Sequence, residues 1–333
     1  MQIKYIDGPR LHRAIQAGIN HVITRKDYLN KINVFPVPDG DTGTNMTFTL
    51  ATISEETKSN NNKRVSKAVA DASLNGARGN SGSILAQFFG GFADGIASFH
   101  RFTPGRFSQA IKTSKNYSYD TLSEPKEGTI LSVIADWAYA VKNIHETHND
   151  FVMILDFTFE QVQESLRKTQ EKLAILKKSG VVDAGTQGFV DFLEGINHFI
   201  EKGEMDDVDT STIAEPVDNF EMEIFNEFRY CTECLVAGND IDRIKLKEQL
   251  MNLGANIVLA GSKKKAKIHI PASVSGTMQS ATLAAGDTED LPIDLIDSQN
   301  GSVGIGLIAL QAAEAVKAEL PKEEILKTRQ KNW

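Results

Sequence analysis

The sequence predicts a multidomain protein: an all-α domain over residues 1–202, a small α+β domain over 220–271 and a short α/β segment over 272–333. Three observations support this prediction. Apolar residues recur at steps of three and four through the first two hundred residues, which is typical of amphipathic helices. The acidic stretch GEMDDVDTSTIAEPVD then indicates a linker at 203–219. Beyond it, short apolar runs alternate with helical patterns, which favours mixed structure.

Four apolar stripes define the strongest helices of the first domain, at 11–23, 84–96, 130–144 and 189–200. Weaker patterns near 44–58, 63–76, 106–117 and 154–177 bring the expected number to about eight, with no convincing strand. In the second domain FRYCTECLVAG, ANIVLAG and KAKIHIP predict strands, and IDRIKLKEQLMNLG predicts a helix. In the last segment LPIDLID predicts a strand and SVGIGLIALQAAEAVKAEL a helix.

Composition and charge exclude several classes of function. The 333 residues are 41% hydrophobic and 24% charged, which is ordinary for a globular protein. The net charge of −8 argues against sequence-independent binding to nucleic acid or anionic membranes. No stretch approaches the roughly 20 apolar residues of a membrane-spanning helix, and the start MQIKYIDGPR lacks a signal-peptide pattern. We therefore expect a cytoplasmic protein with no nucleic-acid partner and no integral membrane segment.

The segment NVFPVPDGDTGTNM, residues 33–46, carries the most informative chemistry. Asp39 and Asp41 stand two residues apart in a loop that contains two glycines. Two carboxylates so close repel each other unless a cation lies between them, so they predict a divalent metal such as Mg²⁺. Hydroxyl and amide side chains follow at an expected helix start, where free backbone N–H groups favour an anion: Thr42, Thr44 and Asn45. Together these residues predict a metal–phosphate site, with an ordinary acidic turn as the alternative.

Two further glycine-containing loops open onto helices. GARGNSGSIL at 76–85 presents backbone amides to an anion, with Asn80 or Ser81 as the expected N-cap. GVVDAGTQGF at 180–189 opens the last helix of the domain and contributes Asp183 and Thr186. Three such loops at the edge of one helical domain suggest a nucleotide cradle.

In this order, the three loops resemble the DhaL-type nucleotide-binding domain of dihydroxyacetone kinases, and the first is similar to its fatty acid kinase branch. The resemblance covers residues 1–200 almost entirely. It implies an antiparallel barrel of eight helices that holds ATP through two magnesium ions, with Asp39 and Asp41 as metal ligands. The positions that match its phosphate loops are Thr44, Asn45, Asn80, Ser81 and Gly82. Those in segments near the nucleotide are Thr129 and Asp183 to Gly185.

Two positions depart from the family pattern. Asn33 stands closest to the place of a further upstream carboxylate in the metal cluster, and Gln187 stands where a second glycine is expected. The resemblance implies an ATP-dependent phosphotransferase, and phosphoryl transfer needs positioning and charge neutralisation more than covalent protein chemistry. No residue stands out as a base for the acceptor, because in these kinases the acceptor is presented by a separate protein or domain. For the fatty acid kinase branch that partner is a DegV-type fatty-acid-binding protein; a homodimer is left open.

The segments FRYCTECLVAG and KIHIP resemble the middle domain of the fatty acid kinase catalytic subunit, where a cysteine and two histidines can bind zinc. Cys231 and His269 match two of these ligands. The third position is Pro271, which cannot bind a metal, so Zn²⁺ requires Cys234 as a substitute. Packed thiols beside a strand histidine are the alternative that we favour over zinc.

The tail resembles the central stretch of DegV proteins, in PASVSGTMQSATLAA and the following LPIDLIDSQNGSVGIGLIALQAAEAV. The hydroxyls of Ser273, Ser275 and Thr277 correspond to those that lie by a bound carboxylate in that family. About sixty residues match, which is too few to enclose an acyl chain. We therefore expect a segment that packs on the middle domain rather than a working lipid site.

Three other functions stay open from the sequence alone. The first is direct phosphorylation of dihydroxyacetone, and the second is a nucleotide-binding scaffold without catalysis. The third is a haloacid-dehalogenase-type phosphatase, because DGDTGT also reads as D-x-D-x-T with Asp39 as nucleophile. That phosphatase requires an apolar strand ahead of Asp39, and two prolines interrupt the segment.

Overall fold

The computed structural model describes residues 2–36, 38–57, 65–96, 100–208, 230–251 and 257–272. The helices of the first part are α1 (Gly8–Thr24), α2 (Lys26–Lys31), α3 (Thr42–Thr57), α4 (Val65–Gly76), α5 (Gly79–Ile96), α6 (Pro104–Thr121), α7 (Ile130–His145), α8 (Phe151–Lys172), α9 (Ala174–Ser179) and α10 (Ala184–Lys202). Two short strands pair antiparallel, β1 (Ile6–Asp7) and β2 (Arg101–Phe102). The later elements are β3 (Tyr230–Ala237), α11 (Arg243–Leu250), β4 (Val258–Gly261) and β5 (Lys265–Ala272).

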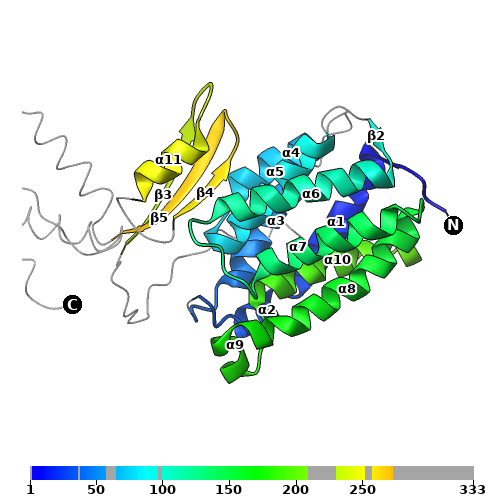
Figure 1. The fold of residues 1–333 in the computed structure, drawn as a ribbon, viewed down its shortest axis with the longest axis horizontal. Coiled ribbons are helices and arrows are strands. Elements are labelled where there is room, and N and C mark those ends of the chain that lie inside the picture. The colour runs from blue at the N-terminus through cyan, green and yellow to red at the C-terminus, as the bar shows by residue number, and fades with distance from the viewer. Residues whose placement is uncertain are drawn as a thin grey trace, which may run out of the picture. The chain divides into compact units, whose positions relative to one another are not determined.

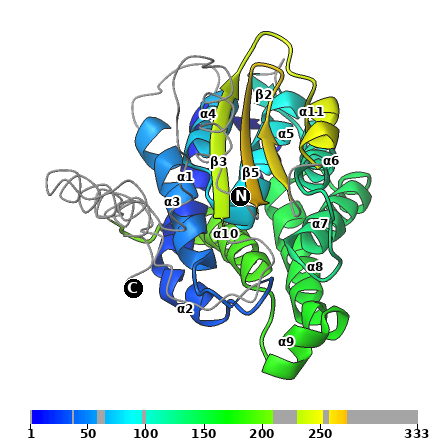
Figure 2. The same cartoon turned by 90° about the vertical axis from the view of Figure 1, so that its left-hand side faces the viewer.

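Eight long helices of the described part close into a ring (Figures 1 and 2). In order around the ring they are α1, α3, α4, α5, α6, α7, α8 and α10, and α10 packs back against α1. The six-residue helices α2 and α9 occupy the connections before α3 and α10. The predicted eight-helix barrel is therefore confirmed. Within the described residues, the sequence did not predict the short helix α2, the separation of α9 from α8 or the two-residue pairing of β1 with β2.

Side-chain caps and glycines set the ends of these helices. Asp7 accepts a hydrogen bond from the Arg10 backbone N–H at 3.0 Å and so begins α1. Asp150 caps α8 in the same way. Gly180 and Gly203 end α9 and α10 in the left-handed conformation, at φ of 68° and 76°, which glycine adopts without a steric penalty.

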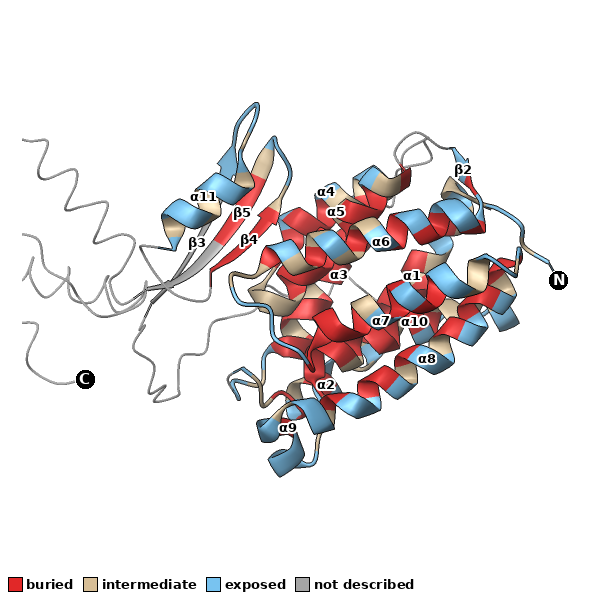
Figure 3. Ribbon diagram, viewed as in Figure 1, coloured by how far each residue is buried: buried red, intermediate tan, exposed pale blue. Residues whose placement is uncertain are grey.

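The buried faces of the ring helices meet in one hydrophobic core (Figure 3). An aromatic cluster occupies its centre, where the Trp137 ring lies 5.9 Å from that of Phe107 and 5.8 Å from that of Phe189, centroid to centroid. The buried indole N–H donates to the Thr158 hydroxyl at 3.2 Å, so its polar atom is satisfied. None of the helices in the described residues is long and apolar enough to cross a bilayer.

The strands and the helix predicted for the second domain are present. The sheet has the order β3-β5-β4, and β4 pairs antiparallel with β5 from Val258 opposite His269 to Gly261 opposite Ala266. By its internal contacts the chain divides into one unit of residues 1–223 and 233–269, and another of 224–232 and 270–333. This division differs from the predicted one, because β4 packs on α5 of the barrel. The boundaries at 202, 219 and 271 stay predictions, since residues 209–229 and 273–333 lie outside the described part.

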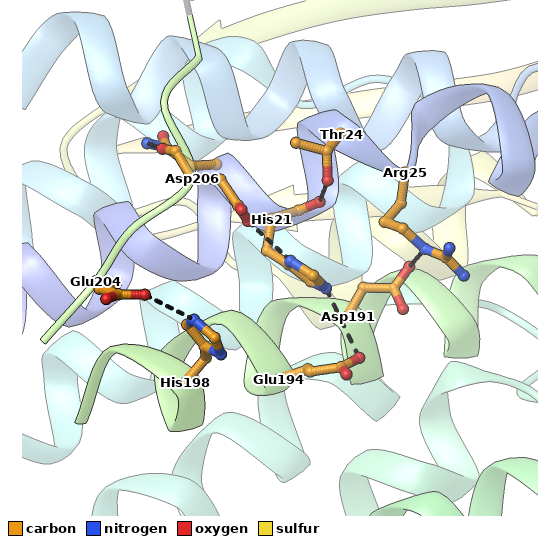
Figure 4. Close-up of polar contacts among 9 residues, drawn as sticks. His21, Thr24, Arg25, Asp191, Glu194, His198, Glu204 and Asp206 are labelled. Atoms are coloured by element: carbon orange, nitrogen blue, oxygen red, sulfur yellow. Dashed lines mark hydrogen bonds and ion pairs between the residues drawn. The ribbon is translucent and has the colours of Figure 1, made fainter. Parts of the chain in front are cut away.

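A polar cluster ties the chain that leaves α10 back onto α1 (Figure 4). The His21 ring lies 2.9 Å from Asp206 Oδ2 through Nδ1 and 3.7 Å from Glu194 Oε2 through Nε2. Asn20 Nδ2 also donates to the Asp206 carbonyl at 2.6 Å. The interactions with Glu194 and then Asp206 raise the pKa of His21 to about 9, against the opposing effect of burial. His21 is therefore charged at neutral pH and links two carboxylates.

We expect this cluster to make the stability of the protein fall as pH rises. The folded pKa of His21, about 9, lies above the roughly 6.5 of an unfolded chain. Its stabilisation is therefore complete below pH ~6.5 and is lost as pH rises through ~9. The free energy of unfolding should drop over this window in the native protein, and the drop should be smaller in His21→Gln.

The matched control is His148→Gln, which replaces a histidine hydrogen-bonded to the Thr147 hydroxyl. This variant should keep the native slope of stability against pH in denaturant titrations. Parallel slopes for the native protein and His21→Gln would contradict the assignment.

Candidate nucleotide site

The N-termini of four barrel helices, α3, α5, α7 and α10, lie beside one another. A Cβ added to Gly79, the first residue of α5, would lie 2.7 Å from Asn45 Nδ2 in the first turn of α3. A Cβ added to Gly185 in the first turn of α10 would lie 2.9 Å from Ser81 Oγ and 3.8 Å from Ile130 Cβ at the start of α7. The structure therefore brings together all four segments in which the sequence places nucleotide contacts.

Buried amides hold the two carboxylates of the first loop. Asn33, 5% exposed, donates from Nδ2 to Asp39 Oδ1 at 2.5 Å, and Asn45, 9% exposed, donates to Asp41 Oδ2 at 2.7 Å. Asp39 and Asp41 themselves are exposed. Buried neutral amides therefore orient both carboxylates of this loop.

Asn33 occupies the place of a third metal ligand in the sequence prediction. In the structure both ends of its side-chain amide are engaged, since Nδ2 binds Asp39 and Oδ1 accepts a hydrogen bond from the Thr42 hydroxyl. This arrangement makes Asn33 a residue that orients Asp39 and Thr42. A role as a direct metal ligand stays a prediction.

The sequence reasoning missed Asn30, which builds the start of α3. Its side chain accepts from the Thr44 backbone N–H at 3.0 Å and donates to the Thr44 hydroxyl at 2.9 Å. A Cβ at Gly43 would overlap the Lys26 carbonyl oxygen, so glycine lets the backbone of α2 approach this turn. No local pattern marks Asn30, because the contact joins residues 14 positions apart.

The second loop enters its helix earlier than predicted. The expectation that Asn80 or Ser81 is the N-cap is wrong, because α5 already begins at Gly79 and Gly82 N donates to the Arg78 carbonyl at 3.1 Å. Gly79 has a φ of 56°, and the helix begins two or three residues sooner than an N-cap at Asn80 or Ser81 would allow. Asn80 and Ser81 consequently lie in the first turn, both partly exposed, where backbone N–H groups lack partners within a helix.

Asp183 joins the N-termini of α7 and α10. Its buried carboxylate caps α10 by accepting from the Thr186 backbone N–H and hydroxyl, both at 2.8 Å, and it also accepts from the backbone of Ile130 in α7. Burial raises the pKa of Asp183, because desolvation disfavours the charged form. Thr129 is the N-cap of α7 and uses its hydroxyl to bind the Lys126 carbonyl at 2.8 Å. Asp183 and Thr129 are thus buried residues that begin α10 and α7, whereas Asp39 and Asp41 are exposed.

Among the described residues, no group of three or more His, Cys, Asp or Glu side chains is arranged to hold a metal. A pair of carboxylates still suits Mg²⁺, which takes one or two carboxylates and completes its shell with water and phosphate oxygens. For zinc, Cys231 lies in β3 and His269 in β5, and their side chains, like that of Cys234, lie outside the described ones. The zinc site stays a prediction, and so do the hydroxyl positions at 273–277, which are outside the described residues.

The phosphatase alternative is not supported by the fold. It needs a strand that ends at Asp39, whereas the chain reaches this residue from α2 through irregular backbone. The preceding helix and the closed helical ring leave no strand of the described barrel beside this loop.

Residues 36–198 match the model of the DAK2 domain, and residues 247–332 match that of the DegV family. The helical barrel of this chain is therefore similar to the DAK2 domain. This domain includes every predicted nucleotide contact from Asp39 to Gly185. The predicted resemblance to DhaL-type and DegV proteins is therefore confirmed, with the DegV match beginning in α11, ahead of the predicted boundary at 272.

Curated relatives are similar to this chain over about nine-tenths of its length. Protein YloV of Bacillus subtilis is 29% identical over 320 residues, which cover 91% of this chain and 58% of YloV. Uncharacterised proteins of Staphylococcus haemolyticus and Staphylococcus aureus are each 29% identical over 90% of this chain. The chain spans 57–58% of the length of these relatives.

Among solved structures, the dihydroxyacetone kinase from C. freundii in complex with AMP-PNP and Mg²⁺ superposes with a TM-score of 0.43 at 14% identity. The superposition covers 56% of this chain and 33% of that one.

The capping role of Asp183 predicts different results for two substitutions. Asp183→Asn keeps an acceptor for the Thr186 N–H and removes the cost of a buried charge, so stability should stay within ~0.5 kcal/mol of the native value. Asp183→Ala loses the cap and should cost about 1 kcal/mol. Urea titration measures both, and an equal loss in the two variants would show that the ionised carboxylate itself is required.

Proposed function

We propose that this protein is a Mg²⁺-dependent phosphotransferase that binds the phosphates of ATP where the N-termini of α3, α5, α7 and α10 meet. The observation that carries the proposal is the placement of an acidic pair beside these helix ends. The first turns of helices present unpaired N–H groups and a positive end of the helix dipole, which favour an anion. The carboxylates of Asp39 and Asp41 would repel that anion unless a cation joined them, so the two features are complementary only with a metal–polyphosphate.

In this proposal one set of residues binds the metal and another set binds the phosphates. Asp39 and Asp41 would hold magnesium, two ions in the family pattern, in the orientation that the buried amides impose. The backbone N–H groups at the starts of α3 and α5, together with the side chains of Thr44, Asn80 and Ser81, would bind phosphate oxygens. Magnesium supplies neutralisation of the charge that develops on the transferred phosphoryl group. Positioning of the nucleotide is then the contribution of the chain itself.

For the acceptor, we propose a fatty acid carboxylate presented by a DegV-type carrier protein. The match of residues 247–332 to the DegV family and the similarity of the first loop to the fatty acid kinase branch support this choice. Dihydroxyacetone as direct acceptor and a scaffold that binds ATP without turnover are the alternatives. A cytoplasmic location belongs to the same proposal, a homodimer stays open, and zinc in the β3–β5 sheet stays a weaker part of the proposal.

Neutralising either acidic residue should abolish tight binding of Mg-ATP. In isothermal calorimetry, Asp39→Asn and Asp41→Asn should each raise the Kd at least tenfold, about 1.4 kcal/mol, because each removes a charged metal ligand and keeps the shape of the side chain. Asp71→Asn on α4 is the matched control, since Asp71 is exposed and pairs with Lys67 at 2.8 Å. Equal heats for the native protein and both loop variants would refute the proposed site.

Turnover should depend on the carrier as well as on the nucleotide. With Mg-ATP, ADP release in a coupled assay should rise when a DegV-type protein loaded with fatty acid is added, and Asp41→Asn should remove the rise. Dihydroxyacetone alone replaces the carrier in a parallel reaction. Release with dihydroxyacetone but not with the carrier would favour the first alternative, and nucleotide binding without release in either reaction would favour the scaffold.

A further inference from the structure

A buried lysine of β5 reaches the loop that precedes α5. Lys267 is 8% exposed, and its Nζ donates a hydrogen bond to the carbonyl oxygen of Ala77. An ammonium group in such surroundings is costly unless polar partners compensate for its desolvation, and the Ala77 carbonyl is one such partner. The contact joins residues 190 positions apart, and Lys267 lies outside the 36–198 match to the DAK2 domain.

The Ala77 peptide lies directly before the candidate phosphate loop. The next residue, Arg78, donates its backbone N–H to Thr49 Oγ1 at 3.3 Å and accepts from Gly82 N at 3.1 Å. The Arg78 guanidinium stacks over the Phe48 ring at 5.0 Å and also approaches the Ala77 carbonyl at 3.4 Å. The orientation of the 77–78 peptide thus determines how Gly79, Asn80 and Ser81 enter α5.

Other contacts hold the β4–β5 hairpin against α5 and α4. The Gly261 carbonyl accepts from Gln87 Nε2 of α5 at 3.1 Å and from Arg243 Nη1 at 2.8 Å. Lys265, two residues before Lys267 on β5, donates to Asn75 Oδ1 of α4 at 2.5 Å. The hairpin is therefore held at several points, and Lys267 is the contact that reaches the loop itself.

We propose that Lys267 is a positioning residue of the nucleotide site, which holds the 77–82 loop in the conformation that receives the polyphosphate of a nucleoside triphosphate. The inference rests on the proposed function for the identity of the ligand. It adds that nucleotide binding requires the β4–β5 hairpin as well as the DAK2 domain.

The test compares three variants of the full chain. Lys267→Met keeps the aliphatic stem without the ammonium group, and Lys267→Arg keeps the charge. Lys265→Met is the matched control on the same strand, because Lys265 makes its contact with α4 and not with the loop. In calorimetry, Lys267→Met should raise the Kd of Mg-ATP at least tenfold and that of AMP much less. Lys267→Arg should stay within about threefold of the native Kd and Lys265→Met within about twofold.

Hydrogen exchange supplies a readout that does not depend on nucleotide. In Lys267→Met the amides of residues 78–82 should exchange at least tenfold faster while those of α8, on another part of the ring, keep their native rates. A general loss of stability would accelerate both. Should Lys267→Met not fold, Lys267→Gln, which also removes the charge, takes its place with the same expected values.

The outcomes separate this inference from the proposed function. A folded Lys267→Met with native affinity for Mg-ATP, or with native exchange at 78–82, overturns the role of Lys267. A native protein that binds no Mg-ATP refutes the proposed function, whereas faster exchange confined to 78–82 would in that case still support the tether.

Discussion

The candidate site depends on hydrogen bonds that two buried amides donate to two exposed carboxylates near the start of α3. Asn33 and Asn45 are fixed by the barrel, and through them the barrel fixes Asp39 and Asp41. Charged donors in the same positions would neutralise the pair and compete with a cation for its oxygens. Neutral amides orient the carboxylates at little electrostatic cost.

The barrel explains why the helix N-termini come together. Closure of the ring by α10 on α1 brings the loop before α10 back to the starts of α3 and α5, although more than a hundred residues separate these loops. Glycines at the contact points, Gly79 and Gly185, allow the loops to approach more closely than a Cβ would permit. Closely apposed helix ends concentrate positive potential in one place, and the acidic loop places negative charge beside it. A bound metal–polyphosphate satisfies both.

The sequence predicted what depends on local pattern. The period of the apolar residues located the eight ring helices, and the glycine-rich loops identified the segments that meet at the site. It placed the start of α5 two or three residues late, because the N-cap preference of Asn80 and Ser81 outweighed the less obvious turn at Gly79. It could not find Asn30 or Lys267, since their roles come from packing of elements that lie far apart in the chain. Residues that support a site through tertiary contacts leave no local signal.

The contacts of β5 help to define which residues beyond the barrel belong to the same structural unit. A match to the DAK2 domain that stops at residue 198 suggests a barrel sufficient for nucleotide binding. Yet residues 233–269 belong to the same compact unit as the barrel, and Lys267 donates to the carbonyl just before the loop that opens α5. A buried charge is retained at a cost, and this one lies where its loss would release the 77–82 backbone. Residues 233–269 are thus better understood as part of the barrel's compact unit than as an independent appendage. On this inference, a movement of the β4–β5 hairpin would alter the affinity for nucleotide, because Lys267 of the hairpin donates a hydrogen bond to the loop that precedes α5.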